Sequence, residues 1–224
     1  MDQFLFSLIN SQGITPALDR WMAVLSCFDF WKPLLALALA GTAVWGGFKA
    51  RALLLVLLVT VGLTDGVVVN GLKHWANRPR PHQVEEARVV DLAKTKPRLL
   101  AVAKPVVVWI SKPLPGPIAG RSFPSGHTSD NFAVAAVLAL FYRRRGWLYF
   151  LVAAAIGYSR IYTGAHWPSD VLASAFLGTG LGVLGFTAAE GAWRCWGGRL
   201  APEWRRRHPS LAGCVAFSRE GIVV

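Results

Sequence analysis

The sequence predicts an all-α fold, a polytopic membrane bundle of transmembrane helices. Apolar residues make up 54% of the 224 residues and charged residues 16%, whereas about 25% of an average soluble domain is charged. The apolar residues also gather in blocks that approach the roughly 20 residues an α-helix needs to cross a bilayer. We therefore expect a single membrane-embedded domain over residues 1–224.

Five apolar blocks are expected to be transmembrane helices. Glycines recur in the last block, and Gly178 and Gly182 among them allow helices to pack closely in lipid. The expected spans cover residues 31–48, 52–75, 124–142, 147–162 and 168–189.

Residues 1–30 have a different pattern. A short apolar stretch is followed by Gly13, Pro16, Asp19 and Arg20. This predicts N-terminal amphipathic helices that lie at the membrane interface or re-enter it. A sixth full span is the alternative, although it would place Asp19 and Arg20 inside the bilayer, where charged side chains are costly.

The formal charge of +12 lies in the gaps between the apolar blocks, which indicates membrane topology rather than nucleic-acid binding. Basic linkers follow the first, third and fifth expected spans, at Lys49 and Arg51, at 143–145 and at 194–207. These linkers fall on one face, and the positive-inside rule makes that face cytoplasmic. We expect a multi-pass inner (cytoplasmic) membrane protein with a cytoplasmic C-terminus.

The opposite face carries residues 82–120, where basic residues mix with Glu85, Glu86 and Asp91. This segment is long for an unstructured connection, so we expect a functional lid or a surface helix on that side. Its apolar stretches suit a segment lying on the membrane. Cys27, Cys195 and Cys214 have no metal-binding spacing and are expected to be ordinary small apolar residues. The N-terminus lacks the features of a removable signal peptide.

Three polar clusters interrupt the apolar blocks, all at the same end of the expected bundle. The first runs K-H-W-A-N-R-P-R-P from Lys73 to Pro81 and closes the second span. Lys73 and Arg80 are seven residues apart, nearly two helical turns, so both can point the same way. The alternative is a basic helix end whose side chains reach to the lipid headgroups.

The second cluster, R-S-F-P-S-G-H-T, begins at Arg121 and opens the third span. A Pro-Ser-Gly turn that leads into a helix exposes backbone N–H groups at the positive end of the helix dipole, which favours anion binding. His127 follows this turn and can hold or give a proton near neutral pH. The alternative is that Ser125 only caps the helix.

The third cluster, S-R-I-Y-T-G-A-H-W-P-S-D, runs from Ser159 to Asp170 and opens the fifth span. His166 and Asp170 are four residues apart and would share one face of a helix. Asp170 could then accept a hydrogen bond from one imidazole nitrogen and leave the other more nucleophilic. Arg160 can bind a phosphate with two hydrogen bonds. A hydrogen-bonded pair at a helix start is the alternative.

Together the clusters favour phosphoryl transfer, because they offer cations, a nucleophile and an acid for the leaving group. Charged groups beside membrane spans are costly and are usually functional. The sequence has no metal-binding motif, so we expect neither a metal nor another cofactor. His74 is expected to face away from the site. Asp65 and Asn70 either line a polar interior or bind a neighbouring helix, and Asp130 either tunes His127 or caps its helix.

The three clusters resemble the signature motifs of the type 2 phosphatidic acid phosphatase superfamily, membrane lipid phosphate phosphatases related to vanadium haloperoxidases. That pattern is K-x6-R-P, P-S-G-H and S-R-x5-H-x3-D. Here it is filled at residues 73–81, 124–127 and 159–170, in order. The match covers nearly half of the chain, and three separated motifs with correct spacing are specific.

The resemblance implies a role for each matching residue. His166 would attack phosphorus and form a phosphohistidine, and Asp170 would orient it. His127 would protonate the leaving oxygen and later assist water.

The remaining motif residues would bind the phosphate: Lys73, Arg80 and Arg160 through their charges, and Ser125 and the Gly126 N–H through hydrogen bonds.

The expected function is therefore hydrolysis of a lipid phosphate or pyrophosphate, with undecaprenyl pyrophosphate, phosphatidylglycerophosphate, phosphatidate and lipid A phosphate as candidates. Recycling of a carrier-lipid pyrophosphate, or action on a related envelope lipid, leads among these because the site is expected to face the periplasm or cell exterior. The alternatives are a lipid phosphotransferase, a lipid-binding or transport protein and, more weakly, a haloperoxidase. No nucleic acid or obligate protein partner is expected.

Overall fold

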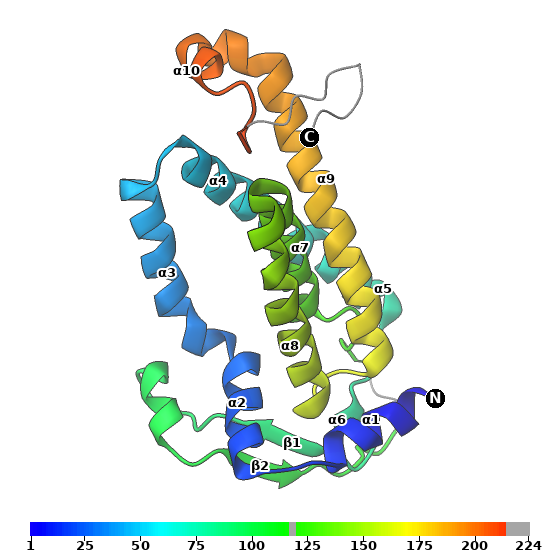
Figure 1. The fold of residues 1–224 in the computed structure, drawn as a ribbon. Helices are drawn as coiled ribbons and strands as arrows, with labels where there is room; N and C mark the ends of the chain where they lie inside the picture. The colour runs from blue at the N-terminus through cyan, green and yellow to red at the C-terminus, as the bar shows by residue number, and fades with distance from the viewer. Residues whose placement is uncertain (117–119, 214–224) are drawn as a thin grey trace.

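The chain folds into a bundle of helices with a small sheet at one end (Figure 1). The structure is a computed structural model, and it describes residues 1–116 and 120–213. Its elements are α1 (Asp2–Ser11), α2 (Pro16–Ser26), α3 (Phe28–Trp45), α4 (Phe48–Leu63), the π-helix η1 (Thr64–Val69), α5 (Asn70–Ala76), α6 (Pro81–Val84), β1 (Arg88–Asp91), the 3-10 helix η2 (Arg98–Ala103), β2 (Val107–Ile110), α7 (Gly126–Tyr142), the 3-10 helix η3 (Arg143–Leu148), α8 (Tyr149–Tyr162), α9 (Pro168–Leu200) and α10 (Pro202–Arg207).

Each expected span corresponds to helical structure. Within the described part of the chain, Phe48–Val84 and Pro168–Leu200 are long and apolar enough to cross a membrane, and α2 with α3 forms a third such segment bent by 55°. Helices α7 and α8 have 17 and 14 residues, fewer than the roughly 20 of a full crossing. The protein is thus mostly helical with apolar membrane-type helices, and the count of five or six spans stays a prediction.

The N-terminal residues form two short helices, α1 and α2, as the pattern predicted. The charges of Asp19 and Arg20 made a sixth span the less favourable alternative. In the structure the Asp19 carboxylate is buried, where it forms an ion pair with Arg88 and accepts a 2.5 Å hydrogen bond from the Tyr162 hydroxyl. These partners compensate the burial of the charge.

The segment 82–120 differs from the expected surface helix. Strands β1 and β2 pair antiparallel, with Arg88 opposite Ile110 and Asp91 opposite Val107, and the 3-10 helix η2 lies between them. The all-α expectation is therefore corrected to a mostly helical fold with one two-stranded sheet. The run of β-branched residues at Val106–Val108 favours extended backbone over helix.

Helix α9 continues well past residue 189, where the expected span ended. No proline interrupts the chain until Pro202. Glu190 and Arg194, which are one helical turn apart, form an ion pair (2.7 Å) that supports the extended helix. Pro202 cannot continue the hydrogen-bond ladder, so it starts the separate helix α10.

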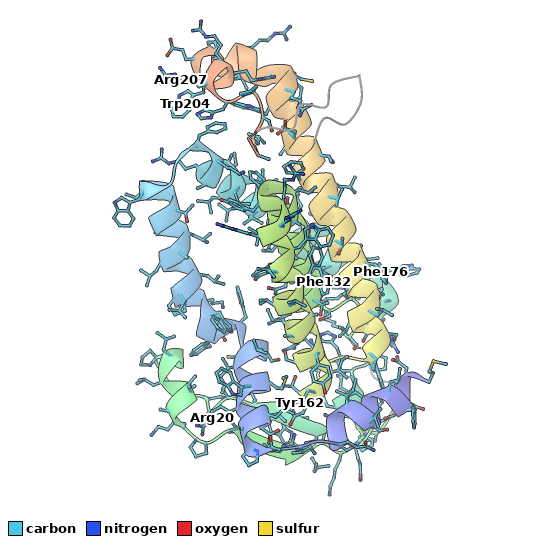
Figure 2. All side chains as sticks on the ribbon, viewed as in Figure 1. Arg20, Phe132, Tyr162, Phe176, Trp204 and Arg207 are labelled. Carbon is cyan, nitrogen blue, oxygen red and sulfur yellow. The ribbon has the colours of Figure 1, made fainter. Side chains whose placement is uncertain are left out.

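The basic linkers gather at one end of the bundle, as the topology argument requires. The Lys49 ammonium lies 4.9 Å from the centre of the Tyr142 ring, next to the 143–145 linker. Phe48 stacks on Trp204 with 5.8 Å between ring centres. Figure 2 shows Trp204 and Arg207 at this end, and Arg20 and Tyr162 at the other.

Helices α7 and α9 make the closest packing in the bundle. An ideal Cβ built on Gly178 would lie 2.1 Å from the Ser129 carbonyl oxygen, and one on Gly182 would lie 2.5 Å from the Ala133 carbonyl oxygen. Only glycine fits this distance between the two backbones, as expected for close helix packing in lipid. The contact fixes the first turns of α7 and α9 relative to one another.

Replacement of Gly178 by valine is therefore expected to destabilise the protein by about 1–3 kcal/mol, because the new side chain overpacks the interface. Thermal denaturation in detergent measures the change. Gly180→Val is the matched control, since a Cβ there meets no atom within 4 Å. Equal stability of the two variants would contradict this account of the packing.

Candidate active site

The three motifs meet at the end of the bundle opposite the basic linkers. A Cβ on Gly126, in the second motif, would lie 3.5 Å from the Lys73 ammonium of the first. The Trp167 indole N–H, in the third motif, donates a 3.0 Å hydrogen bond to the carbonyl of Pro79 in the first. Segments that are far apart in the sequence thus form one site.

His166 is positioned by a backbone carbonyl. Its side chain is buried, and Nδ1 donates a 2.7 Å hydrogen bond to the Ser122 carbonyl oxygen. A carbonyl only accepts, so Nδ1 carries the proton and Nε2 holds the lone pair of the neutral ring. Burial, and then the charges of Arg160 and Arg80, lower the pKa of His166 well below its ordinary value. The ring is therefore neutral at pH 7, as a nucleophile requires.

Asp170 does not bind His166, and this corrects the geometric expectation for the pair. Its buried carboxylate accepts hydrogen bonds from the Ser122 hydroxyl (2.5 Å), from Arg78 Nη1 (2.5 Å) and from the Trp167 backbone N–H (3.2 Å). The four-residue spacing argument fails because His166 lies in the turn before α9, which begins at Pro168. Asp170 therefore turns back to cap its own helix.

His127 lies in the first turn of α7, within electrostatic range of His166, Arg160 and Lys73. The Phe28 ring meets its imidazole edge to face, with 6.1 Å between ring centres. The two histidines of the motifs are thus close together among positive side chains.

Three cations surround the histidines. Arg160 Nη1 donates to the Ser26 hydroxyl and, at 3.2 Å, to the Ser26 carbonyl. Its buried Nε has no hydrogen-bond partner among the described residues, and an unsatisfied buried donor calls for a ligand or another explanation. Lys73 lies near Asp65 and Asp130, and Arg80 lies near both histidines.

Ser125 and Gly126 form the start of α7. The Ser125 backbone N–H donates to the Ser174 hydroxyl (2.8 Å), and the Ser125 hydroxyl accepts from Thr128 (3.0 Å). Ser125 makes no side-chain cap, and its hydroxyl hydrogen can still donate. Gly126 lies close to Asp65 and Lys73, because a Cβ on it would be 3.2 Å from an Asp65 carboxylate oxygen. The contact between Asp65 and this turn favours the polar-interior alternative for Asp65.

Sequence reasoning missed Ser122, Arg78 and Ser174. Ser122 lies two residues before the Pro-Ser-Gly-His run, and Arg78 lies between the two basic positions of the first motif. The position of Ser122 and Arg78 next to motif residues was the only signal in the sequence that they belong to the site. Their partner, Asp170, lies far away in the sequence.

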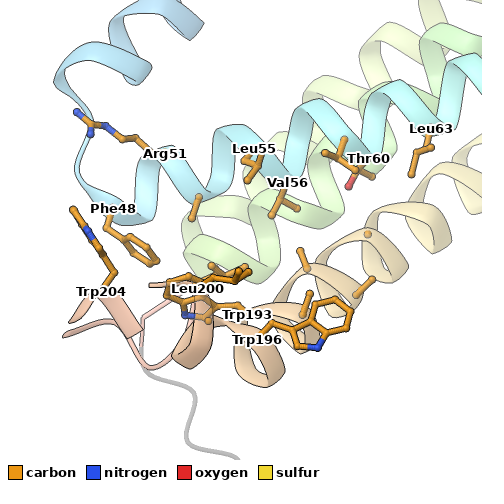
Figure 3. A pocket seen from close by; sticks show the side chains of 18 of the residues that line it. Phe48, Arg51, Leu55, Val56, Thr60, Leu63, Trp193, Trp196, Leu200 and Trp204 are labelled. Atoms are coloured by element: carbon orange, nitrogen blue, oxygen red, sulfur yellow. The ribbon is translucent and has the colours of Figure 1, made fainter. Parts of the chain in front are cut away.

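A cavity of about 820 Å³ lies elsewhere, between α4, α9 and α10 (Figure 3). Its walls are apolar apart from Arg51, Thr60 and Thr64, and no residue of the three motifs lines it. The polar site at the other end, which contains the three motifs, is therefore the candidate for chemistry.

Comparison with known proteins agrees with the motifs. Residues 52–194, more than half of the chain, match the model of the PAP2 superfamily. The chain belongs to the PAP2 superfamily. The matched region contains all three motifs, so the resemblance predicted from them is confirmed.

PAP2 relatives include a putative undecaprenyl-diphosphatase YbjG of Escherichia coli, 27% identical over 88% of this chain and 84% of the relative. The bacitracin transport permease protein BcrC of Bacillus licheniformis is 47% identical over 26% of this chain and 29% of the relative. The crystal structure of Aquifex aeolicus LpxE superposes with a TM-score of 0.58 at 26% identity, covering 83% of this chain and 94% of that one. The chain spans less than two thirds of the length of most of the curated relatives that it matches.

The lowered pKa of His166 has a consequence for stability. Below pH 6.5 the unfolded state binds a proton at this histidine and the folded state does not, so its contribution to stability falls by about 1.4 kcal/mol per pH unit. His166→Gln keeps a donor for the Ser122 carbonyl but cannot titrate. Melting temperatures between pH 7.5 and pH 5 are expected to fall less steeply for this variant, and parallel curves would contradict the neutral buried ring.

Proposed function

We propose that this PAP2 protein is a membrane lipid phosphatase that forms a phosphohistidine at His166. The observation that carries the proposal is the state of that side chain: buried, neutral and held through Nδ1, with Arg80, Arg160 and His127 within electrostatic range. Nε2 keeps the lone pair, so it is the atom that can attack phosphorus.

In the first step Nε2 of His166 bonds to phosphorus, and the bond from phosphorus to the lipid oxygen breaks. The leaving oxygen takes the electron pair and a proton from His127, whose imidazolium form the negative charge of the bound phosphate favours. Water then attacks the phosphohistidine, gives a proton to His127, and releases inorganic phosphate with His166 restored. Lys73 and Arg160 neutralise the phosphate oxygens, together with Arg80, throughout both steps.

Ser125 and Gly126 are assigned a supporting part in phosphate binding. The free hydrogen of the Ser125 hydroxyl and the Gly126 N–H lie at the start of α7, at the positive end of its dipole. The space that the missing Cβ of Gly126 leaves beside Lys73 suits a phosphate oxygen. A larger residue there would occupy that space.

The substrate is assigned to the envelope lipids. The names of the relatives support an isoprenoid diphosphate or lipid A, since they include undecaprenyl-diphosphatases and lipid A 1-phosphatases. The basic linkers lie at the end opposite the site. By the positive-inside rule this supports a site that faces the periplasm or cell exterior, with the end of α9 in the cytoplasm. Phosphatidylglycerophosphate and phosphatidate complete the set of substrates to test.

His166→Ala is expected to lower phosphate release at least about 1,000-fold, because the nucleophile is lost. The measurement is a phosphate-release panel with purified protein and four lipids: undecaprenyl pyrophosphate, phosphatidylglycerophosphate, phosphatidate and lipid A. His74→Ala is the matched control, since His74 is exposed and contacts Arg121 rather than a motif histidine. Vanadate is expected to inhibit, and EDTA to leave activity intact.

Unchanged release by His166→Ala would overturn the mechanism, and a metal requirement would contradict the role given to the three cations. Transfer of phosphate to an added lipid acceptor, with little free phosphate, would identify a phosphotransferase instead.

Exchange of residues 82–120 for the equivalent segment of a relative is expected to change the preference among the four lipids more than the turnover of the preferred one. This segment forms the sheet at the site end of the bundle, and all four side chains of β2 are exposed. Relative kcat/KM values measure the preference. An unaltered ranking would show that the segment does not select the lipid.

A further inference from the structure

Helix α1 lies across the site end of the bundle, beside the start of α9 and the end of α8 (Figure 1). Asp2, Phe6 and Asn10 are four residues apart and therefore line one face of this helix. All three contact the segment that carries His166, at points along residues 162–169. An amphipathic surface helix does not need such specific polar contacts.

Asp2 binds the first turn of α9. Its carboxylate accepts hydrogen bonds from the Ser169 backbone N–H (3.0 Å), the Ser169 hydroxyl (2.6 Å) and Arg78 Nη2 (2.6 Å). Partial burial opposes its ionisation, but the Ser169 hydrogen bonds and the Arg78 charge outweigh this and lower the pKa of Asp2. The carboxylate is thus charged at neutral pH.

Arg78 links Asp2 to the buried Asp170. Its Nη1 donates to Asp170 Oδ1 (2.5 Å) while its Nη2 binds Asp2, and its guanidinium lies 5.7 Å from the centre of the Trp167 ring. Asp170 in turn accepts from the Ser122 hydroxyl, and the carbonyl of the same serine holds His166 Nδ1. A path of hydrogen bonds, joined through the covalent frame of Ser122, therefore runs from α1 to His166.

The far end of α1 holds the other side of the turn. Asn10 Nδ2 donates to the carbonyl of Tyr162 (2.8 Å), the last residue of α8, and the Asn10 side-chain oxygen accepts from the Arg88 N–H (2.8 Å). Between the two ends, the Phe6 ring packs against Trp167 with 5.3 Å between ring centres. Helix α1 thus contacts the turn before, beside and after His166.

We propose that helix α1 positions the nucleophile: its Asp2, Phe6 and Asn10 face clamps the turn that carries His166, and Arg78 connects this clamp to Asp170 and Ser122. This inference rests on the proposed phosphatase function. Arg78 and Asp2 are positioning residues, since they act through Asp170 and Ser122 and not on the phosphate. A misplacement of about 1 Å in a reacting group can slow a reaction on the order of 100-fold.

Burial separates this role from a general contribution to stability. The side chains of Asp2 and Arg78 are 26% and 35% exposed, whereas that of Asp170 is fully buried. Exposed ion pairs contribute about 1 kcal/mol or less. Loss of Asp2 is therefore expected to affect catalysis far more than folding, whereas loss of Arg78 also removes a partner of the buried Asp170 carboxylate and costs stability.

The test compares Asp2→Asn and Arg78→Gln with Ser7→Ala, a control on another face of α1 whose hydroxyl binds only within its own helix. We expect kcat to fall about 10- to 100-fold in the first two, with KM changed less than about threefold, and the melting temperature of Asp2→Asn to stay within about 4 °C of wild type. Ser7→Ala is expected to match wild type. Phosphohistidine formation, followed with a labelled lipid in a single turnover, is expected to slow by the same factor as kcat.

Coupling is measured with the double variant Asp2→Asn/Arg78→Gln, which is expected to be no slower than Arg78→Gln alone because both act on one path. Arg78→Lys, which retains one donor, is expected to fold like wild type and recover part of the lost kcat, and it replaces Arg78→Gln if that variant is unstable.

Wild-type kcat in well-folded Asp2→Asn, additive losses in the double variant, or a rise in KM alone would each overturn the clamp. A wild-type protein that releases phosphate from none of the four lipids would instead overturn the proposed function.

Discussion

The close contact between α7 and α9 is the constraint on which the site depends. Gly178 and Gly182 let the two backbones approach to a distance that no other residue permits. The first turn of α7 carries His127, and the first turn of α9 carries Asp170. Helices held this closely in lipid turn two distant stretches of sequence into one rigid platform for charged groups.

That platform holds an electrostatic arrangement which is unfavourable unless a ligand completes it. Lys73, Arg80 and Arg160 converge on two histidines at the end of an apolar bundle. Burial, and then the charges of Arg160 and Arg80, keep His166 unprotonated, and the same cations attract an anionic headgroup. In the proposed mechanism the same charges therefore help to keep the nucleophile neutral and also attract the phosphate of the substrate.

Local patterns in the sequence predicted most of the helices and the chemistry of the motifs. Lys73 and Gly126 meet as expected because each lies at a helix end whose position is set by an apolar block. The expected Asp170–His166 bond was wrong because the helix starts two residues after the histidine, and a spacing rule holds only inside a helix. The sheet in residues 82–120 was missed for a related reason: the apolar stretches there were too short to distinguish strand from surface helix.

The contacts of Asp2 with Ser169 and of Asn10 with Tyr162 left no signal in the sequence. They join residues that are far apart in the sequence. From the sequence alone, an aspartate or asparagine in a short helix could equally well be a side chain exposed to solvent. Only the folded arrangement shows that a segment predicted to lie at the interface contacts the turn that carries His166.

The π-helix η1 lies between α4 and α5. Because of it, the orientation of Lys73 depends on the number of residues in this span as well as on their hydrophobicity. A π-helical stretch holds an extra residue relative to an α-helix, and here it lies between the apolar part of the span and Lys73. Deletion of a single residue from Thr64–Val69 would turn everything after it by about 100°, which would carry the Lys73 ammonium away from Gly126. Geometry therefore constrains insertions and deletions within this stretch. If an alignment with a relative opens a gap there, the lysine that it pairs with Lys73 does not point into the equivalent site.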